Sequence, residues 1–197
     1  MIRLVLAGLL AGLANLATAQ NFDLPALFDV TGVTQEDVLN IRQNPTADAP
    51  IVGSFGPKDK NIEVITVTAT GTWGQVNGPE QSGWVAMRFL DRQPHFGFPR
   101  LTQCFGTEPF WSLAFDGSQI TLTTPDGAPQ TQGHIWRTQA AGLTGVYGFG
   151  AGPWVAAVRG QSCNDGMSDR AFGLTVDLLL GRGPGTMMLS GCCTLAK

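Results

Sequence analysis

Short apolar runs separated by turn residues fill the first half of the chain. Residues 62–68 alternate between apolar and polar side chains, which predicts a strand with its aliphatic residues on one face. Further short strands are predicted at 30–33, 38–42, 51–55, 72–76 and 83–86. Strands of this length at this spacing are typical of a small β-barrel.

The second half of the chain shows the same period of two. Trp111, Leu113 and Phe115 fall on one face of a strand, and Asp116-Gly117 supplies a turn after it. Other strands are predicted at 120–123, 134–138, 154–158, 174–180 and 186–192. About seven or eight antiparallel strands without a helical run favour a second β-barrel or a β-sandwich, and hence an all-β protein.

Two prolines, Pro94 and Pro99, separate the halves. Proline has no backbone N–H to donate to a strand ladder, and the surrounding residues 91–100 show no hydrophobic period. We therefore expect an N-terminal domain at 20–92, a linker at 93–100 and a C-terminal domain at 101–197.

Composition and charge narrow the function classes. The chain has 197 residues, of which 43% are hydrophobic and 14% charged, so it has enough apolar surface to fold. It has 12 basic and 15 acidic residues, and this balance provides no cationic field for nucleic-acid phosphates. Nucleic acid is therefore not an expected partner.

Residues 1–19 have the pattern of a secretory signal peptide. Arg3 precedes an apolar stretch at 4–16, and Ala17-Thr18-Ala19 supplies small residues at the cleavage positions, so cleavage is expected after Ala19. The stretch is shorter than the ~20 residues of a membrane-spanning helix. We expect a mature protein without a membrane span, located in the periplasm or secreted. A buried N-terminal helix is the alternative, but the run has no polar face.

All four cysteines lie in the C-terminal domain: Cys104, Cys163, Cys192 and Cys193. An even number of cysteines in an exported chain indicates disulfides. Because neighbours in a strand point to opposite faces, each residue of the vicinal pair is expected to join one distant cysteine, and the pairing itself stays open. A zinc site is the alternative, but CxxC spacing is absent. We expect no metal and no cofactor.

A combination of elements within residues 30–92 carries a resemblance. Leu39-Asn40-Ile41-Arg42 is followed by a loop at Pro45, the alternating segment 62–68, Trp73 and Gly83-Trp84-Val85. This order resembles the bacterial SH3-like domain, a barrel of five or six strands common in exported envelope proteins. The resemblance implies binding of cell-wall peptides or glycans, or a targeting role beside a catalytic domain.

A barrel of ~60 residues needs most of its aromatic side chains for its core, so one or two are expected to face a groove. We take Trp73 and Trp84 as candidate ligand-binding residues, together with Arg42 and Arg88. The two arginines would suit a carboxylate-bearing wall peptide. The alternative is that they are simply solvated.

The C-terminal domain contains three specific blocks, at 104–111 (CFGTEPFW), 163–170 (CNDGMSDR) and 191–193 (GCC). They resemble an uncharacterised family of proteobacterial exported proteins, and this resemblance implies no mechanism. The glycine-rich run at 148–152 lacks the following helix of a phosphate-binding loop, so tight turns or a glycine-rich strand are expected there. The segment 164–169 is expected to be a turn stiffened by Asp side chains.

Glu108 is the sharpest candidate for catalysis. It lies beside Pro109 and close to Phe110 and Trp111, an environment that can raise the pKa of a carboxyl and suit a general acid. Because no second catalytic group accompanies it, we favour a structural role, in which Glu108 caps a turn and the two aromatic residues fill the core. We keep Glu108 and Trp111 as candidate ligand-binding residues and name no catalytic residue.

The sequence therefore predicts a non-catalytic envelope protein that binds peptidoglycan or an envelope protein through its SH3-like domain. The alternatives are an envelope enzyme that uses Glu108 and an inhibitor of lysozyme-like hydrolases. The pattern does not specify an oligomeric state.

Overall fold

The structure is a computed structural model that describes residues 23–95 and 97–195. The predicted signal peptide at 1–19 lies outside the described residues. Within them the protein is all-β, as predicted, with one short 3-10 helix. No helix in the described ranges is both long enough and apolar enough to span a membrane. The two disulfides of the C-terminal domain fit a protein exported to an oxidising compartment.

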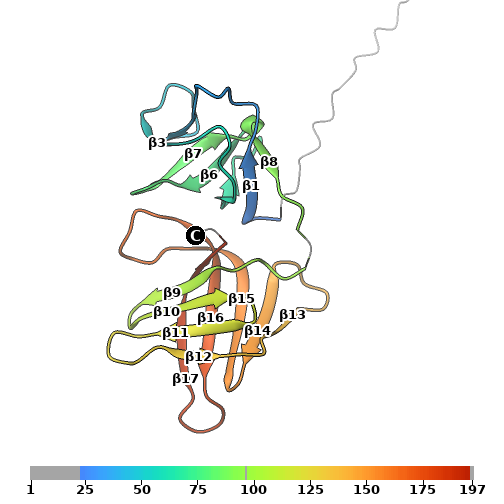
Figure 1. Ribbon diagram of the computed structural model, residues 1–197, viewed down its shortest axis with the longest axis vertical. Coiled ribbons are helices and arrows are strands. Elements are labelled where there is room, and N and C mark those ends of the chain that lie inside the picture. Colours follow the sequence, from blue (N-terminus) through green and yellow to red (C-terminus); the bar gives the residue numbers. More distant parts are fainter. Residues whose placement is uncertain (1–22, 96, 196–197) are drawn as a thin grey trace, which may run out of the picture.

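The N-terminal domain consists of two small antiparallel sheets packed on one core (Figure 1). Its elements are β1 (Ala26–Val30), β2 (Leu39–Arg42), β3 (Ile51–Phe55), β4 (Ile62–Val64), β5 (Thr66–Val67), β6 (Trp73–Asn77), β7 (Ser82–Ala86), η1 (Met87–Phe89) and β8 (Leu90–Arg92). One sheet has the order β4-β1-β8 and the other β3-β2-β7-β6-β5. Phe28, Ile41, Val76 and Val85 are among the buried residues of the shared core, and each comes from an alternating strand.

The single strand predicted at 62–68 is two strands. The backbone N–H of Ile65 donates to the carbonyl of Gln75 (2.8 Å), so at this residue the chain leaves its pairing with β1 and begins to pair with β6. The strand predicted at 30–33 also differs, because it begins at Ala26 and ends at Val30. Gly32, with φ of 66°, turns the backbone away from extended geometry just after that end.

The C-terminal domain is one nine-stranded antiparallel sheet. Its strands are β9 (Gln103–Thr107), β10 (Phe110–Asp116), β11 (Gln119–Thr123), β12 (Gln130–Gln132), β13 (Trp136–Gln139), β14 (Val146–Ala151), β15 (Trp154–Cys163), β16 (Phe172–Leu180) and β17 (Met187–Thr194). Their order is β12-β11-β10-β9-β17-β16-β15-β14-β13. Strands β9 and β12 add to those predicted, and β14 covers most of the glycine-rich run, where a glycine-rich strand was one of the two expectations.

This sheet curves until its distant parts meet (Figure 1). The rings of Phe115 in β10 and Phe149 in β14 lie 5.1 Å apart, although these strands are not neighbours in the sheet. Arg137 of the edge strand β13 donates a hydrogen bond to the carbonyl of Gly117, in the β10–β11 turn (3.3 Å). The domain is therefore a partly open barrel, the first of the two predicted alternatives.

The two disulfides join the vicinal cysteines of β17 to different partners. Cys104 pairs with Cys193, and Cys163 pairs with Cys192. Cys104 and Cys193 face each other across β9 and β17, whereas Cys163 lies at the end of β15. The prediction that each vicinal cysteine joins a distant one is confirmed. Since all four sulfurs are in disulfides, none serves as a zinc ligand or a nucleophile.

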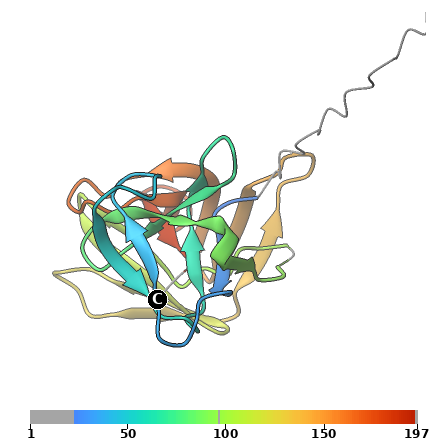
Figure 2. The same cartoon turned by 90° about the horizontal axis from the view of Figure 1, so that it is seen from above.

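The N-terminal domain lies directly on the C-terminal domain, as the two views in Figures 1 and 2 show. Asn77 makes a two-way hydrogen bond with the backbone of Ala171, donating from Nδ2 (2.9 Å) and accepting at Oδ1 (3.2 Å). The backbone N–H of Ser82 donates to the carbonyl of Asp169 (2.9 Å), and Arg170 donates to the carbonyl of Pro79 (2.6 Å).

A buried carboxylate makes a second set of contacts at this seam. Glu63 of β4 is the only buried charged side chain among the described residues. Its Oε2 accepts hydrogen bonds from the Thr194 hydroxyl and from the backbone N–H of Leu195 (3.1 Å). Leu27 of β1 packs within the core of the C-terminal domain. The alternating pattern at 62–68 placed Glu63 on the polar face, and this expectation is wrong because its partners come from β17 and the residue after it.

Candidate functional site

Trp73 and Trp84 project from the outer face of the five-stranded sheet. In β6 and β7 the inward positions are taken by Val76 and Val85, which are fully buried. The two tryptophans occupy the alternate positions and are half-buried. Trp84 lies opposite Arg42 of β2 in the strand register, so these side chains share the outer face.

Three of the predicted ligand-binding residues line one cavity of about 260 Å³ on this face: Arg42, Trp73 and Arg88. They come from the end of β2, the start of β6 and the short helix η1. One guanidinium nitrogen of Arg42 donates to the carbonyl of Ala49 (2.9 Å), which fixes the orientation of the group. The guanidinium of Arg88 lies 4.6 Å from the centre of the Phe89 ring.

The charge of this cavity favours an anion. Its lining contains the guanidinium groups of Arg42 and Arg88 and one carboxylate, that of Asp37. Asp37 accepts a hydrogen bond from the backbone N–H of Val38 (2.8 Å), so one of its carboxylate oxygens already has a partner within the loop. A planar guanidinium presents paired donors to a carboxylate, and the Trp73 ring offers an adjacent apolar surface.

Trp111 is a core residue of the C-terminal barrel. Its side chain is 4% exposed and lies across two glycines of neighbouring strands, Gly106 and Gly191. A Cβ on Gly106 would stand 2.3 Å from Trp111 Nε1, and one on Gly191 would stand 2.0 Å from the carbonyl oxygen of Phe105. The close approach of ring and backbone therefore explains the glycines of the GTEPFW and GCC blocks. Phe110 is 51% exposed, so the expectation that it fills the core is wrong.

Glu108 occupies the tight turn between β9 and β10 and is exposed to solvent. It lines an open groove of about 470 Å³ on the C-terminal barrel that also contains Asp165 and Asp177. The aromatic enclosure on which the general-acid hypothesis depends is not formed, because Trp111 points into the core and Phe110 is exposed.

The other two carboxylates of the groove are held in the ionised state. A hydrogen bond from Arg159 (2.7 Å), and then one from Ser190, lower the pKa of Asp177. Desolvation raises the pKa of Asp165, but the hydrogen bonds from Ser168 and Met167 outweigh it, and its pKa is lowered overall. A general acid requires the opposite shift. The bonds of Asp165 also stiffen the turn at 164–169, as predicted.

The described residues contain no group of three or more His, Cys, Asp or Glu side chains placed to hold a metal ion.

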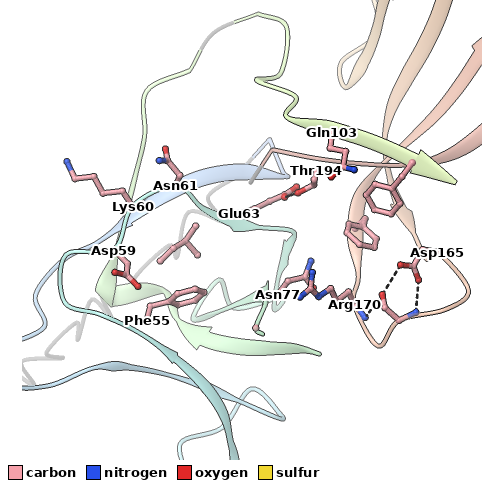
Figure 3. Close-up of a pocket in the computed structure, with 15 residues that line it drawn as sticks. Phe55, Asp59, Lys60, Asn61, Glu63, Asn77, Gln103, Asp165, Arg170 and Thr194 are labelled. Carbon is pink, nitrogen blue, oxygen red and sulfur yellow. Dashed lines mark hydrogen bonds between the residues drawn. The ribbon is translucent and has the colours of Figure 1, made fainter. Parts of the chain in front are cut away.

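A larger cavity, of about 690 Å³, lies at the seam between the two domains (Figure 3). Phe55, Asp59 and Glu63 line it from the N-terminal domain, and Gln103 and Arg170 from the C-terminal domain. Asp59, Glu63, Gln103 and Arg170 were not candidates from the sequence. They come from separate segments of the chain, although Phe105 and Arg170 of the lining belong to the sequence blocks at 104–111 and 163–170.

Comparison of the chain with protein-family models, with curated proteins and with solved structures finds no match. The resemblances to the SH3-like domain and to the exported family stay predictions, and the functional interpretation depends on the geometry of the sites.

Proposed function

We propose that the protein is a non-catalytic component of the bacterial cell envelope that binds the peptide stems of peptidoglycan through its N-terminal domain. The observation that carries this proposal is the convergence of Arg42, Trp73 and Arg88 on one cavity. The three residues are distant in sequence, and each was a ligand-binding candidate before the fold was known. The two disulfides support an exported location.

The chemistry of the cavity suits a stem peptide. Such peptides carry carboxylates, which the two guanidinium groups can receive in charge-assisted hydrogen bonds. Arg42 is already oriented by Ala49, so less side-chain freedom is lost when a ligand binds. Trp73 is half-buried, and it supplies a rigid surface for the apolar part of a short peptide.

The two alternatives have no comparable support. Glu108 is exposed, and the other two carboxylates that line its groove, Asp165 and Asp177, have lowered pKa values. No observation of the described residues singles out a surface for a lysozyme-like hydrolase.

Retention of the mature protein on purified, protein-free sacculi tests the proposal. We expect the wild-type protein to be retained at physiological salt and released as salt rises, because the contact is ionic. Arg88→Ala and Trp73→Ala should each weaken binding about tenfold, since each removes a charge-assisted bond or an aromatic contact.

The matched controls are Arg182→Ala and Trp136→Ala, which remove exposed residues of the same types from the C-terminal barrel. Both controls should bind as the wild type does. Absence of retention at physiological salt would reject wall binding. Retention that none of the four substitutions changes would place the contact on another surface.

A further inference from the structure

The seam cavity is a second site, separate from the one on the outer face of the N-terminal barrel. Its lining shares no residue with that of the first cavity. At about 690 Å³ it falls within the ~300–1,000 Å³ of typical small-molecule sites, which often lie between domains. Both walls are held in place, because Asn77 bonds to Ala171 and Glu63 bonds to Thr194 and Leu195 across the seam.

Aromatic rings face the cavity from both domains. Phe55 contributes from β3, whereas Phe105 and Phe172 contribute from the C-terminal barrel. The rings of Phe105 and Phe172 are packed edge to face, with their centres 4.9 Å apart, so this wall is rigid. The electron-rich face of an aromatic ring is complementary to the polarised C–H bonds on the face of a sugar ring.

Between the rings the lining is polar and almost neutral. It contains the carboxylates of Asp59, Glu63 and Asp165 and the cationic groups of Lys60 and Arg170, three negative against two positive charges. Its other polar side chains are amides and hydroxyls: Asn61, Asn77, Gln103, Ser168 and Thr194. Figure 3 shows Glu63, Asn77 and Gln103 around the space between the two domains, whereas the Lys60 side chain extends away from it.

The combination of aromatic rings with a polar, almost neutral lining favours one class of ligand, a neutral sugar. A polyanion is disfavoured, because Asp59, Glu63 and Asp165 lie in the same cavity as the two cationic groups. A purely apolar ligand would remove water from the polar side chains of Asp59, Lys60 and Gln103, which line the same cavity. A neutral sugar carries many hydroxyl groups, each of which can both donate and accept a hydrogen bond. Carboxylates and amides are suitable partners for such hydroxyl groups.

We propose that the seam between the two domains is a binding site for a neutral oligosaccharide. This inference is independent of the stem-peptide proposal, because it concerns other residues and a ligand without carboxylates. Both domains are required for the site. The sugar rings lie between Phe55 on one side and the Phe105–Phe172 pair on the other, and Asp59 and Gln103 receive hydroxyl groups.

Calorimetric titration of the full mature protein with two soluble probes tests this assignment. The probes are the β-1,4-linked tetramers of N-acetylglucosamine and of glucose, neither of which carries a peptide or a charge. We expect at least one to bind. Failure of both to bind at ~10 mM, a concentration that detects even weak affinities, would overturn the proposal.

Gln103→Ala is the main variant, because Gln103 is an exposed residue of β9 that lines the cavity. It should weaken binding about fivefold, the effect of one lost hydrogen bond. Phe55→Ala should weaken it about tenfold through loss of the stacking surface. The matched control is Gln119→Ala, which removes an exposed glutamine from β11 of the same domain and should bind as the wild type does.

The variants test where the tetramers bind, separately from whether they bind. Binding that Gln103→Ala and Phe55→Ala leave unchanged, or that Trp73→Ala abolishes, would overturn the seam assignment. Loss of sacculus retention together with intact tetramer binding would reject the stem-peptide proposal and leave the seam site standing. Thermal unfolding of each variant shows whether the Phe55 substitution acts through stability.

Discussion

Two adjacent aromatic residues, Phe110 and Trp111, have opposite roles. They belong to the same strand, β10, where successive side chains point to opposite faces. Trp111 is 4% exposed and covers Gly106 and Gly191, whereas Phe110 is 51% exposed. In the block at 104–111, the tryptophan and the glycine therefore serve packing.

Substitution of these two residues separates the roles. Trp111→Ala should lower the free energy of unfolding by about 3–5 kcal/mol, because it leaves a cavity over two strands that have no side chains at Gly106 and Gly191. Phe110→Ala should change it by no more than about 0.5 kcal/mol. Urea denaturation measures both. Equal losses for the two variants would contradict the assignment of Trp111 to the core.

At the scale of elements, β17 connects two neighbouring strands, both disulfides and the N-terminal domain. It pairs with β16 along its length and with β9 near its end, and it carries one cysteine of each disulfide. Its last residue, Thr194, also donates to Glu63 in the N-terminal domain. The integrity of the barrel and of the seam therefore depends on the same strand.

The two disulfides should contribute unequally. The chain-entropy model gives about 4.6 kcal/mol for Cys104–Cys193, with a sequence separation of 89, and about 3.6 kcal/mol for Cys163–Cys192, with a separation of 29. Replacing each pair by alanines and measuring urea denaturation tests the order. A larger loss for the Cys163–Cys192 pair would show that local packing, rather than loop closure, dominates.

Much of the element pattern was predictable because it is local. Leu174, Val176 and Leu178 alternate in sequence, and all three are buried in β16. The break at Ile65 was missed, although the alternation expected over 62–68 is interrupted there by two adjacent apolar residues, Val64 and Ile65. The burial of Glu63 depends on partners that lie more than 130 residues away in the sequence.

The same distinction between local patterns and contacts of distant residues applies to the candidate sites. Arg42, Trp73 and Arg88 could be selected from the sequence because a resemblance placed them in one small domain. The seam cavity could not be selected, since Asp59, Gln103 and Arg170 are separated by long stretches of chain and meet only through the packing of the two domains. The blocks at 104–111 and 163–170 supply part of its lining, but neither block indicates that it faces the other domain.

At the scale of the whole molecule, the two domains form one structural unit. Asn77 bonds to the backbone of Ala171 in both directions, Arg170 bonds to Pro79, and Leu27 packs in the opposite core. Leu27 adds apolar packing to these hydrogen bonds, and apolar packing is what restricts relative motion of domains. The seam cavity is therefore a preformed space, and little rearrangement should accompany its occupation.

This coupling predicts a single unfolding transition for the wild-type protein in calorimetry. Asn77→Ala leaves the carbonyl of Ala171 without its Asn77 donor, and it should lower the free energy of unfolding by about 1–3 kcal/mol. Asn44→Ala, at an exposed position of the β2–β3 loop, is the control and should have little effect. Two separate transitions in the wild type would show that the domains are independent.

The native disulfides do not join the cysteines in the order in which the chain is synthesised. Cys104 emerges first, and its native partner Cys193 follows 89 residues later, after Cys163 has already become available. A bond between the first two cysteines is the earliest that an oxidant can form, and it is absent from the native fold. Such a bond must be reopened by attack of another thiolate. Production of this protein in quantity should therefore be limited by disulfide isomerisation rather than by oxidation.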